Sequence, residues 1–173
     1  LAPDLPGHGR TVLEPVPAAY DFDVCLRRLL ATLESTGHRR ADWLGYSMGA
    51  RLALAFALRF PERVVSLLLV GARAGIECSS QRAARRCADD DLANRIEANG
   101  IEAFVDEWLA QPLFASQQRL GREFVAAQRR QRLDNDARAL AASLRGLGPG
   151  AQQPLFDDLP RLDIPVLLVA GAL

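Results

Sequence analysis

Residues 43–51 read WLGYSMGAR, and this stretch decides the fold that we expect for the chain. It contains a G-x-S-x-G motif over residues 45–49, between a segment that reads as a strand and an apolar segment that reads as a helix. The two glycines are expected to let the backbone pass closely through a strained turn that exposes the Ser47 hydroxyl. In this context the motif predicts a reactive serine. The alternative is a glycine-rich turn whose serine only caps the helix.

Apolar segments alternate between strand and helix character on both sides of the motif. The pattern predicts, in chain order, the tail of a strand at residues 1–2, a helix at 21–35, a strand at 41–47, a helix at 48–60 and a strand at 63–72. The run at 63–72 is almost continuously apolar, as in strands that are covered on both faces of a parallel sheet. The order of elements therefore predicts an α/β fold with a mostly parallel, doubly wound sheet.

The composition and the hydrophobic pattern of the sequence change at residue 73, where arginine-rich amphipathic segments without strand character begin. Helices are expected at about 79–98, 101–110, 121–133 and 137–147, with breaks at the sequences NG, QPLF and GLGPG. The segment 154–165 predicts a short helix and a turn, and 166–173 predicts another buried strand. We therefore divide the chain into a first core part (1–72), a helical lid insertion (73–150) and a resumed, truncated core (151–173).

Composition excludes several classes of function. The chain has 21 basic and 21 acidic side chains, so no net charge favours nucleic acid or an anionic membrane. All basic residues are arginines, so arginine stands at every basic position and any single arginine is weaker evidence for a functional role. Three cysteines, Cys25, Cys78 and Cys87, form no metal-binding spacing and predict free thiols in a reducing compartment. No apolar run is long enough for a membrane span, and a cytoplasmic location is expected.

A serine of this kind needs a histidine and a carboxylate, which in α/β-hydrolases follow in the order serine, acid, histidine. The acid is expected directly after the strand that ends at Leu173, and the histidine further on, so residues 1–173 alone are expected to be inactive. Asp163 precedes that strand and falls at the wrong edge of the sheet. His8 is better explained as a loop histidine bonded to backbone, and His38 as a surface residue. The Met48 N–H at the helix start is the expected oxyanion donor.

Several stretches together resemble one enzyme family. They are DLPGHG (4–9), GYSMGAR (45–51), ALRFPERV (57–64), EAFVDEWLAQPLFAS (102–116), ALAASLRGLGPGAQQPL (139–155) and VLLVAGAL (166–173). Nearly the whole chain resembles the 2-succinyl-6-hydroxy-2,4-cyclohexadiene-1-carboxylate synthases (MenH) of menaquinone biosynthesis, with a partial α/β-hydrolase fold. WLAQPLFAS and SLRGLGPGAQ are the specific motifs. Ala50 departs from the family's usual glycine, and GARAGIE (71–77) departs from its usual segment of small residues and proline.

The resemblance implies a lyase rather than a hydrolase. The implied reaction eliminates pyruvate from 2-succinyl-5-enolpyruvyl-6-hydroxy-3-cyclohexene-1-carboxylate, with Ser47 as the base and without a cofactor or metal. Two alternatives stay open: an esterase or carbon-carbon bond hydrolase on the same scaffold, and a chain that binds without catalysis or is an inactive fragment.

The resemblance also implies which side chains bind the anionic substrate. Arginine suits carboxylates because its planar fork donates two parallel hydrogen bonds. The implied substrate-binding residues are Tyr46 beside the nucleophile, the arginines Arg51, Arg85 and Arg132, and the apolar lid residues Trp108 and Phe114. Solvated helix faces would also explain Arg85 and Arg132, and a lid core would also explain Trp108 and Phe114.

Overall fold

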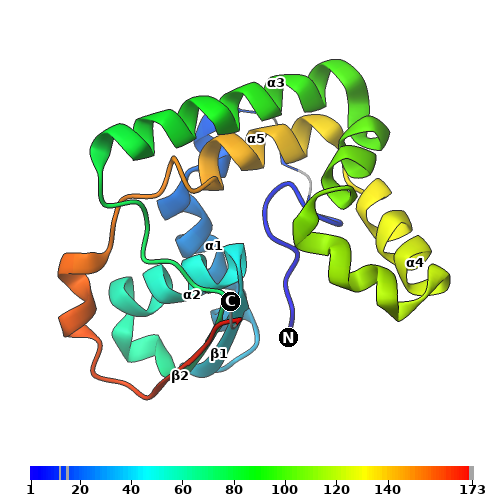
Figure 1. Ribbon diagram of the computed structural model, residues 1–173. Coiled ribbons are helices and arrows are strands. Elements are labelled where there is room, and N and C mark those ends of the chain that lie inside the picture. The colour runs from blue at the N-terminus through cyan, green and yellow to red at the C-terminus, as the bar shows by residue number, and fades with distance from the viewer. Residues whose placement is uncertain (12, 15, 172–173) are drawn as a thin grey trace. The chain divides into compact units, whose positions relative to one another are not determined.

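A computed structural model describes residues 1–11, 13–14 and 16–171 (Figure 1). Contacts divide the chain into two compact units. The core unit comprises Asp21–Cys87 and Leu147–Leu173, and the helical unit comprises Leu1–Tyr20 and Ala88–Gly146. The boundaries at 72/73 and 150/151 remain predictions. In the described part of the chain, no helix is long and apolar enough to cross a membrane.

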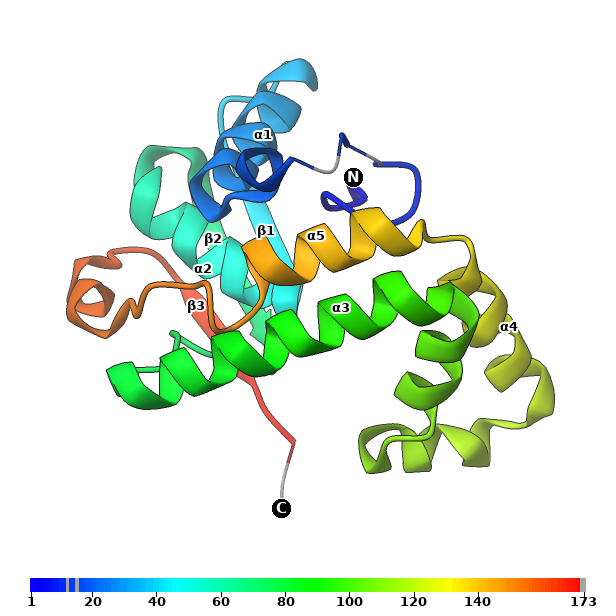
Figure 2. The ribbon, with the colours of Figure 1, turned by 90° about the horizontal axis from the view of Figure 1, so that it is seen from above.

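The core unit is built on a three-stranded parallel sheet (Figure 2). Its strands are β1 (Ala41–Tyr46), β2 (Val64–Val70) and β3 (Val166–Val169), in the spatial order β1-β2-β3. Tyr46 lies opposite Val70 in the β1–β2 pair, so these two strands end together. The predicted α/β class and parallel sheet are confirmed, because each strand is followed or preceded by helical connections rather than by a hairpin.

Helix α2 (Met48–Arg59) forms the centre of the core unit. Its eight residues from 50 to 57 are all buried, as the nearly all-apolar sequence predicts. The ring of Phe56 stacks on Trp43 of β1, with ring centroids 4.1 Å apart. Because α2 follows β1 directly, this packing fixes the direction of the turn that carries Ser47.

Helix α1 (Phe22–Ser35) begins at an N-cap. The Asp21 carboxylate accepts hydrogen bonds from the backbone N–H groups of Asp23 and Val24. The buried face of α1 consists of four residues at helical spacing, Cys25, Leu26, Leu29 and Leu33. The predicted helix at 21–35 is therefore confirmed, and burial raises the pKa of the Cys25 thiol to about 11.

Two sequence predictions about strands were wrong. Strand β3 was expected to be buried, but its four residues are exposed, from 40% for Val166 to 68% for Leu168. Among the described residues, β3 pairs only with β2, so no strand pairs with its outer edge. Leu1 and Ala2 form no strand, and Leu1 is 94% exposed, because no described strand pairs with them. Residues 172–173 of the predicted strand lie outside the described residues.

The segment 73–150 contains helices and no strand, as predicted. Helix α3 (Ser79–Leu109) is interrupted at Gly100 (φ 81°, ψ 174°), where the NG sequence predicted a break. Helices α4 (Arg122–Leu133) and α5 (Ala137–Leu147) agree with the predicted helices at 121–133 and 137–147. The predicted break at QPLF continues into a 3-10 helix, η3 (Pro112–Leu120). The remaining short 3-10 helices are η1 (Pro17–Tyr20), η2 (Pro61–Arg63) and η4 (Phe156–Arg161).

Inside the helical unit, α3 and α5 lie side by side (Figures 1 and 2). Ala93, Ile96 and Ala141 form their buried contact. At its edge, the Arg145 guanidinium donates to both carboxylate oxygens of Glu97 at 2.8 Å. This pairing lowers the pKa of Glu97. Arginines that the sequence left unassigned therefore connect neighbouring helices.

Candidate active site

Ser47 occupies a strained turn between β1 and α2. Its backbone has φ 51° and ψ −110°, and no other non-glycine residue among those described has a positive φ. The Ser47 N–H donates to the Val70 carbonyl at 2.9 Å, which fixes the turn to the end of β2. The serine side chain makes no capping hydrogen bond to α2. The helix-cap alternative is therefore wrong, and the geometry is that of a nucleophile elbow.

The two glycines of the motif differ in their surroundings. A Cβ atom on Gly45 would lie 2.4 Å from the Gly49 carbonyl oxygen and 2.6 Å from the Cα atom of Ala50. Only glycine fits there, as predicted. Apart from the backbone of its own helix, a Cβ atom on Gly49 would meet no described residue within 4 Å, so the expectation that Gly49 also serves close passage was wrong. The reason is that Gly49 lies against Gly45 through its carbonyl oxygen, whereas its Cα hydrogens point into open space.

The groups beside Ser47 are arranged by the strand end and the helix start. Met48 is the first residue of α2, so its N–H has no acceptor within the helix and suits an oxyanion. Tyr46 is the last residue of β1, and it is 67% exposed. Both therefore neighbour the nucleophile, while their predicted roles as oxyanion donor and substrate-binding residue stay predictions.

Arg51 lies one helical turn after Ser47 and is only 7% exposed. Its guanidinium donates from Nη2 to the Leu147 carbonyl at 2.7 Å and from Nη1 to Gln152 Oε1 at 2.9 Å. Both of these acceptors are neutral oxygen atoms. Sequence reasoning missed Leu147 and Gln152 as partners, although both fall in the SLRGLGPGAQ motif on which the resemblance relied.

Arg85 belongs to the first turns of α3 and to the same unit as Ser47 and Arg51. Its side chain is exposed. Its backbone is closely packed, because a Cβ atom on Gly150 would lie 2.9 Å from the Arg85 carbonyl carbon and 2.4 Å from the Arg86 nitrogen. The chain segment after α5 therefore passes directly against the backbone that carries Arg85.

The other predicted substrate-binding residues form one cluster in the helical unit. Trp108 of α3 and Phe114 of η3 lie with ring centroids 5.8 Å apart. The Arg132 guanidinium of α4 lies over the Phe114 ring, 5.6 Å from its centroid, and donates to Gln128. Phe114 is 8% exposed. The elements α3, η3 and α4 thus bring together the three residues to which the resemblance gives a common role. The same contacts form part of the core of the helical unit.

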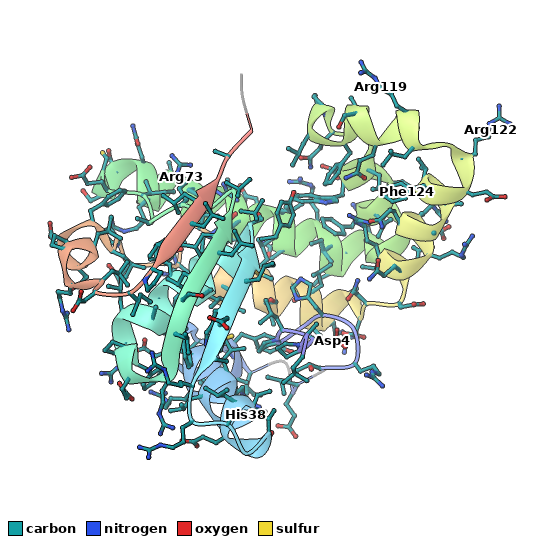
Figure 3. The ribbon with its side chains drawn as sticks, turned by 90° about the horizontal axis from the view of Figure 1, so that it is seen from below. Asp4, His38, Arg73, Arg119, Arg122 and Phe124 are labelled. Atoms are coloured by element: carbon teal, nitrogen blue, oxygen red, sulfur yellow. The ribbon has the colours of Figure 1, made fainter. Side chains whose placement is uncertain are left out.

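The histidines and Asp163 are placed as the sequence suggested. His8 Nδ1 donates to the Pro6 carbonyl at 3.2 Å, and burial lowers the pKa of His8. His38 is exposed and precedes β1 (Figure 3), whereas Ser47 follows the other end of that strand. Six strand residues span roughly 20 Å, so His38 cannot reach the serine hydroxyl. Asp163 precedes β3 and shares that far edge of the sheet.

A cavity of about 490 Å³ lies elsewhere in the core unit. Its lining includes Asp21, Leu58, Arg86 and Gln152, and none of the predicted site residues. Within the described residues, no group of three or more histidine, cysteine, aspartate and glutamate side chains is placed to hold a metal ion.

The strand, strained serine turn and helix define a protein of the α/β-hydrolase class, and comparison with known proteins agrees. The alpha/beta hydrolase fold family matches residues 1–173, and the chain belongs to this family. It is 38% identical over 168 residues to a Bacillus subtilis (strain 168) protein named "Putative 2-succinyl-6-hydroxy-2,4-cyclohexadiene-1-carboxylate synthase", covering 97% of this chain and 61% of that protein.

Two solved structures are also similar. The structure of MenH from S. aureus superposes with a TM-score of 0.86 at 32% identity, over 95% of this chain and 62% of that one. A thermophilic esterase from Thermogutta terrifontis gives a TM-score of 0.78 at 26% identity, over 98% of this chain and 60% of that one. The chain thus spans about three fifths of the length of these relatives.

Proposed function

We propose that the protein is a carbon-oxygen lyase that eliminates pyruvate from 2-succinyl-5-enolpyruvyl-6-hydroxy-3-cyclohexene-1-carboxylate, as the MenH resemblance implies. The observation that carries the proposal is the strained Ser47 turn with a buried arginine, Arg51, one helical turn later. The similarity to the Bacillus subtilis and S. aureus proteins supports the choice of reaction.

In the proposed reaction Ser47 removes a proton from the substrate ring. A histidine activates the serine, and it is proposed, with its carboxylate partner, to lie beyond Leu173. The electron pair of the broken C–H bond forms a new ring double bond as the C–O bond to the enolpyruvyl group breaks. The departing enolate takes up a proton and becomes pyruvate. The Met48 N–H lies where it can stabilise negative charge that develops on the substrate.

Cations are proposed to bind the substrate carboxylates. Arg51 has a planar fork that suits a carboxylate, and hydrogen bonds to Leu147 and Gln152 hold that fork in place. Arg85 and Arg132 are proposed for the remaining carboxylates, with Tyr46, Trp108 and Phe114 as neighbouring walls. Arg51→Lys keeps the charge but loses the planar fork. The transition state should therefore bind more weakly by about the free energy of one charged hydrogen bond, roughly 1.5–3 kcal/mol, and kcat/KM should fall accordingly. A wild-type kcat/KM would refute this role.

A cytoplasmic location is part of the proposal. Cys25, Cys78 and Cys87 are free in the structure, which suits a reducing compartment. A small anionic substrate, no nucleic acid and no cofactor are proposed as well.

A hydrolase is the second candidate, because the similar Thermogutta terrifontis protein is an esterase. A hydrolase must admit water and hold an acyl intermediate, whereas the lyase needs a base near the acidic proton and cations around the carboxylates. The deciding experiment compares kcat/KM for pyruvate release from the anionic cyclohexene with kcat/KM for a neutral p-nitrophenyl ester. The proposal expects efficient pyruvate release and poor ester turnover. Efficient ester hydrolysis without pyruvate release would assign the hydrolase instead.

A further inference from the structure

The chain segment 147–152, with the sequence LGPGAQ, contacts both arginines of the core unit that the proposed function assigns to carboxylate binding. We propose that Gly150 and Gln152 in this segment are positioning residues: Gln152 orients the Arg51 guanidinium, and Gly150 sets the place of the Arg85 backbone. This inference rests on the proposed function and deepens it, since it names what aligns the two cations.

The contact with Arg51 is buried on both sides. Leu147 is fully buried, Gln152 is 1% exposed and Arg51 is 7% exposed. The Leu147 carbonyl ends α5, so it is one of the carbonyls that lack a partner within the helix, and a guanidinium is a favourable neighbour there. With the second bond to Gln152, two points separated in the sequence by five residues hold one planar group. The plane of the Arg51 guanidinium is therefore set by the segment 147–152 and not by α2 alone.

The hydrogen bonding of Gln152 indicates a role beyond stability. A guanidinium only donates, so the amide oxygen must face Arg51 and the amide nitrogen must face elsewhere. That nitrogen is buried and has no hydrogen-bond partner among the described atoms. A buried donor without an acceptor is unfavourable, and an apolar side chain of the same shape would avoid it. The unpaired amide N–H thus offsets part of the stability that the bond to Arg51 contributes.

The contact with Arg85 is made by the backbone. Gly150 has no positive φ, so its dihedral angles do not demand glycine. The demand comes from space, because a Cβ atom would lie 2.5 Å from the Arg86 Cα atom and 2.9 Å from the Arg85 carbonyl carbon. A methyl group here would push the start of α3 away from the segment 147–152 and would move Arg85 with it.

The test uses Gln152→Met, which keeps the shape of the side chain and removes both the bond to Arg51 and the unpaired amide. KM for the anionic cyclohexene should rise about tenfold with kcat nearly unchanged, because carboxylate binding contributes equally to the ground and transition states. The urea midpoint should change little, because loss of the bond to Arg51 destabilises the fold while loss of the unpaired amide N–H stabilises it. Gln152→Glu should raise KM further, because its carboxylate would compete with the substrate for Arg51. Gln153→Met, at the exposed neighbouring position, is the matched control and should leave KM unchanged.

Gly150→Ala should also raise KM, and a soluble, folded variant with wild-type KM would contradict the role of Gly150. If that variant fails to fold, Gln152→Met still decides, because its stability is expected to be retained. Active wild-type enzyme together with unchanged KM in Gln152→Met would overturn the inference alone, and so would a variant that loses only stability. An inactive wild-type enzyme, assayed as the complete protein that includes the residues after Leu173, would overturn the proposed function and the inference with it.

Discussion

Replacing Gly45 by alanine should destabilise the protein, because the new methyl group would meet backbone atoms that cannot move independently. The Cβ atom would lie 2.4 Å from the Gly49 carbonyl oxygen and 2.6 Å from the Ala50 Cα atom, while ordinary contacts begin at 3.4 Å. The end of β1 and the first turn of α2 must therefore separate by about 1 Å. Overpacking of this kind costs about 1–3 kcal/mol.

Gly49→Ala is the matched control within the same motif. Apart from the backbone of its own helix, a Cβ atom there meets none of the described residues within 4 Å, and Gly49 lies in the first turn of α2. Alanine in a helix is more stable than glycine by about 0.5–1 kcal/mol. Urea denaturation of the two variants should therefore give free energies of unfolding that differ by about 1.5–4 kcal/mol, with Gly45→Ala the less stable. Equal stability, or the reverse order, would refute the reasoning about the elbow.

Two further predictions concern titratable groups. A thiol reagent at neutral pH should modify two of the three cysteines quickly and Cys25 only on unfolding, because Cys25 is buried and its pKa is raised to about 11; three fast equivalents would contradict this. Arg145 lowers the pKa of Glu97, so the pair stabilises the fold above the ordinary glutamate value of 4.5 and this contribution is lost as the pH falls through the lowered pKa. Arg145→Met should therefore lower the free energy of unfolding at pH 7 and have little effect near pH 2, and an equal effect at both would argue against the ion pair.

Features that depend on neighbouring residues could be predicted from the sequence. The Ser47 elbow follows from a short motif between two apolar runs, and the interruption of α3 at Gly100 follows from one NG dipeptide. The helix-cap reading of Ser47 could be rejected only from the side-chain geometry.

Features that depend on distant residues could not be predicted. The apolar run of β3 has the composition of a buried strand, but burial depends on what covers it, and its residues are exposed. The partners of Arg51 lie 96 and 101 residues away, so no local pattern pairs them. Gly49 matches the motif as well as Gly45 does. Only the path of the backbone shows that a side chain would clash at Gly45 and not at Gly49.

The most direct test of the proposed function measures pyruvate release from the enolpyruvyl cyclohexene substrate by the complete protein, with the histidine and carboxylate proposed to follow Leu173, and by its Ser47→Ala variant. We expect the variant to keep its urea midpoint, because the serine hydroxyl makes no capping bond to α2, and to lose several powers of ten in kcat/KM. A folded Ser47→Ala variant that releases pyruvate within tenfold of the wild-type rate would contradict the claim that this strained serine is the catalytic base.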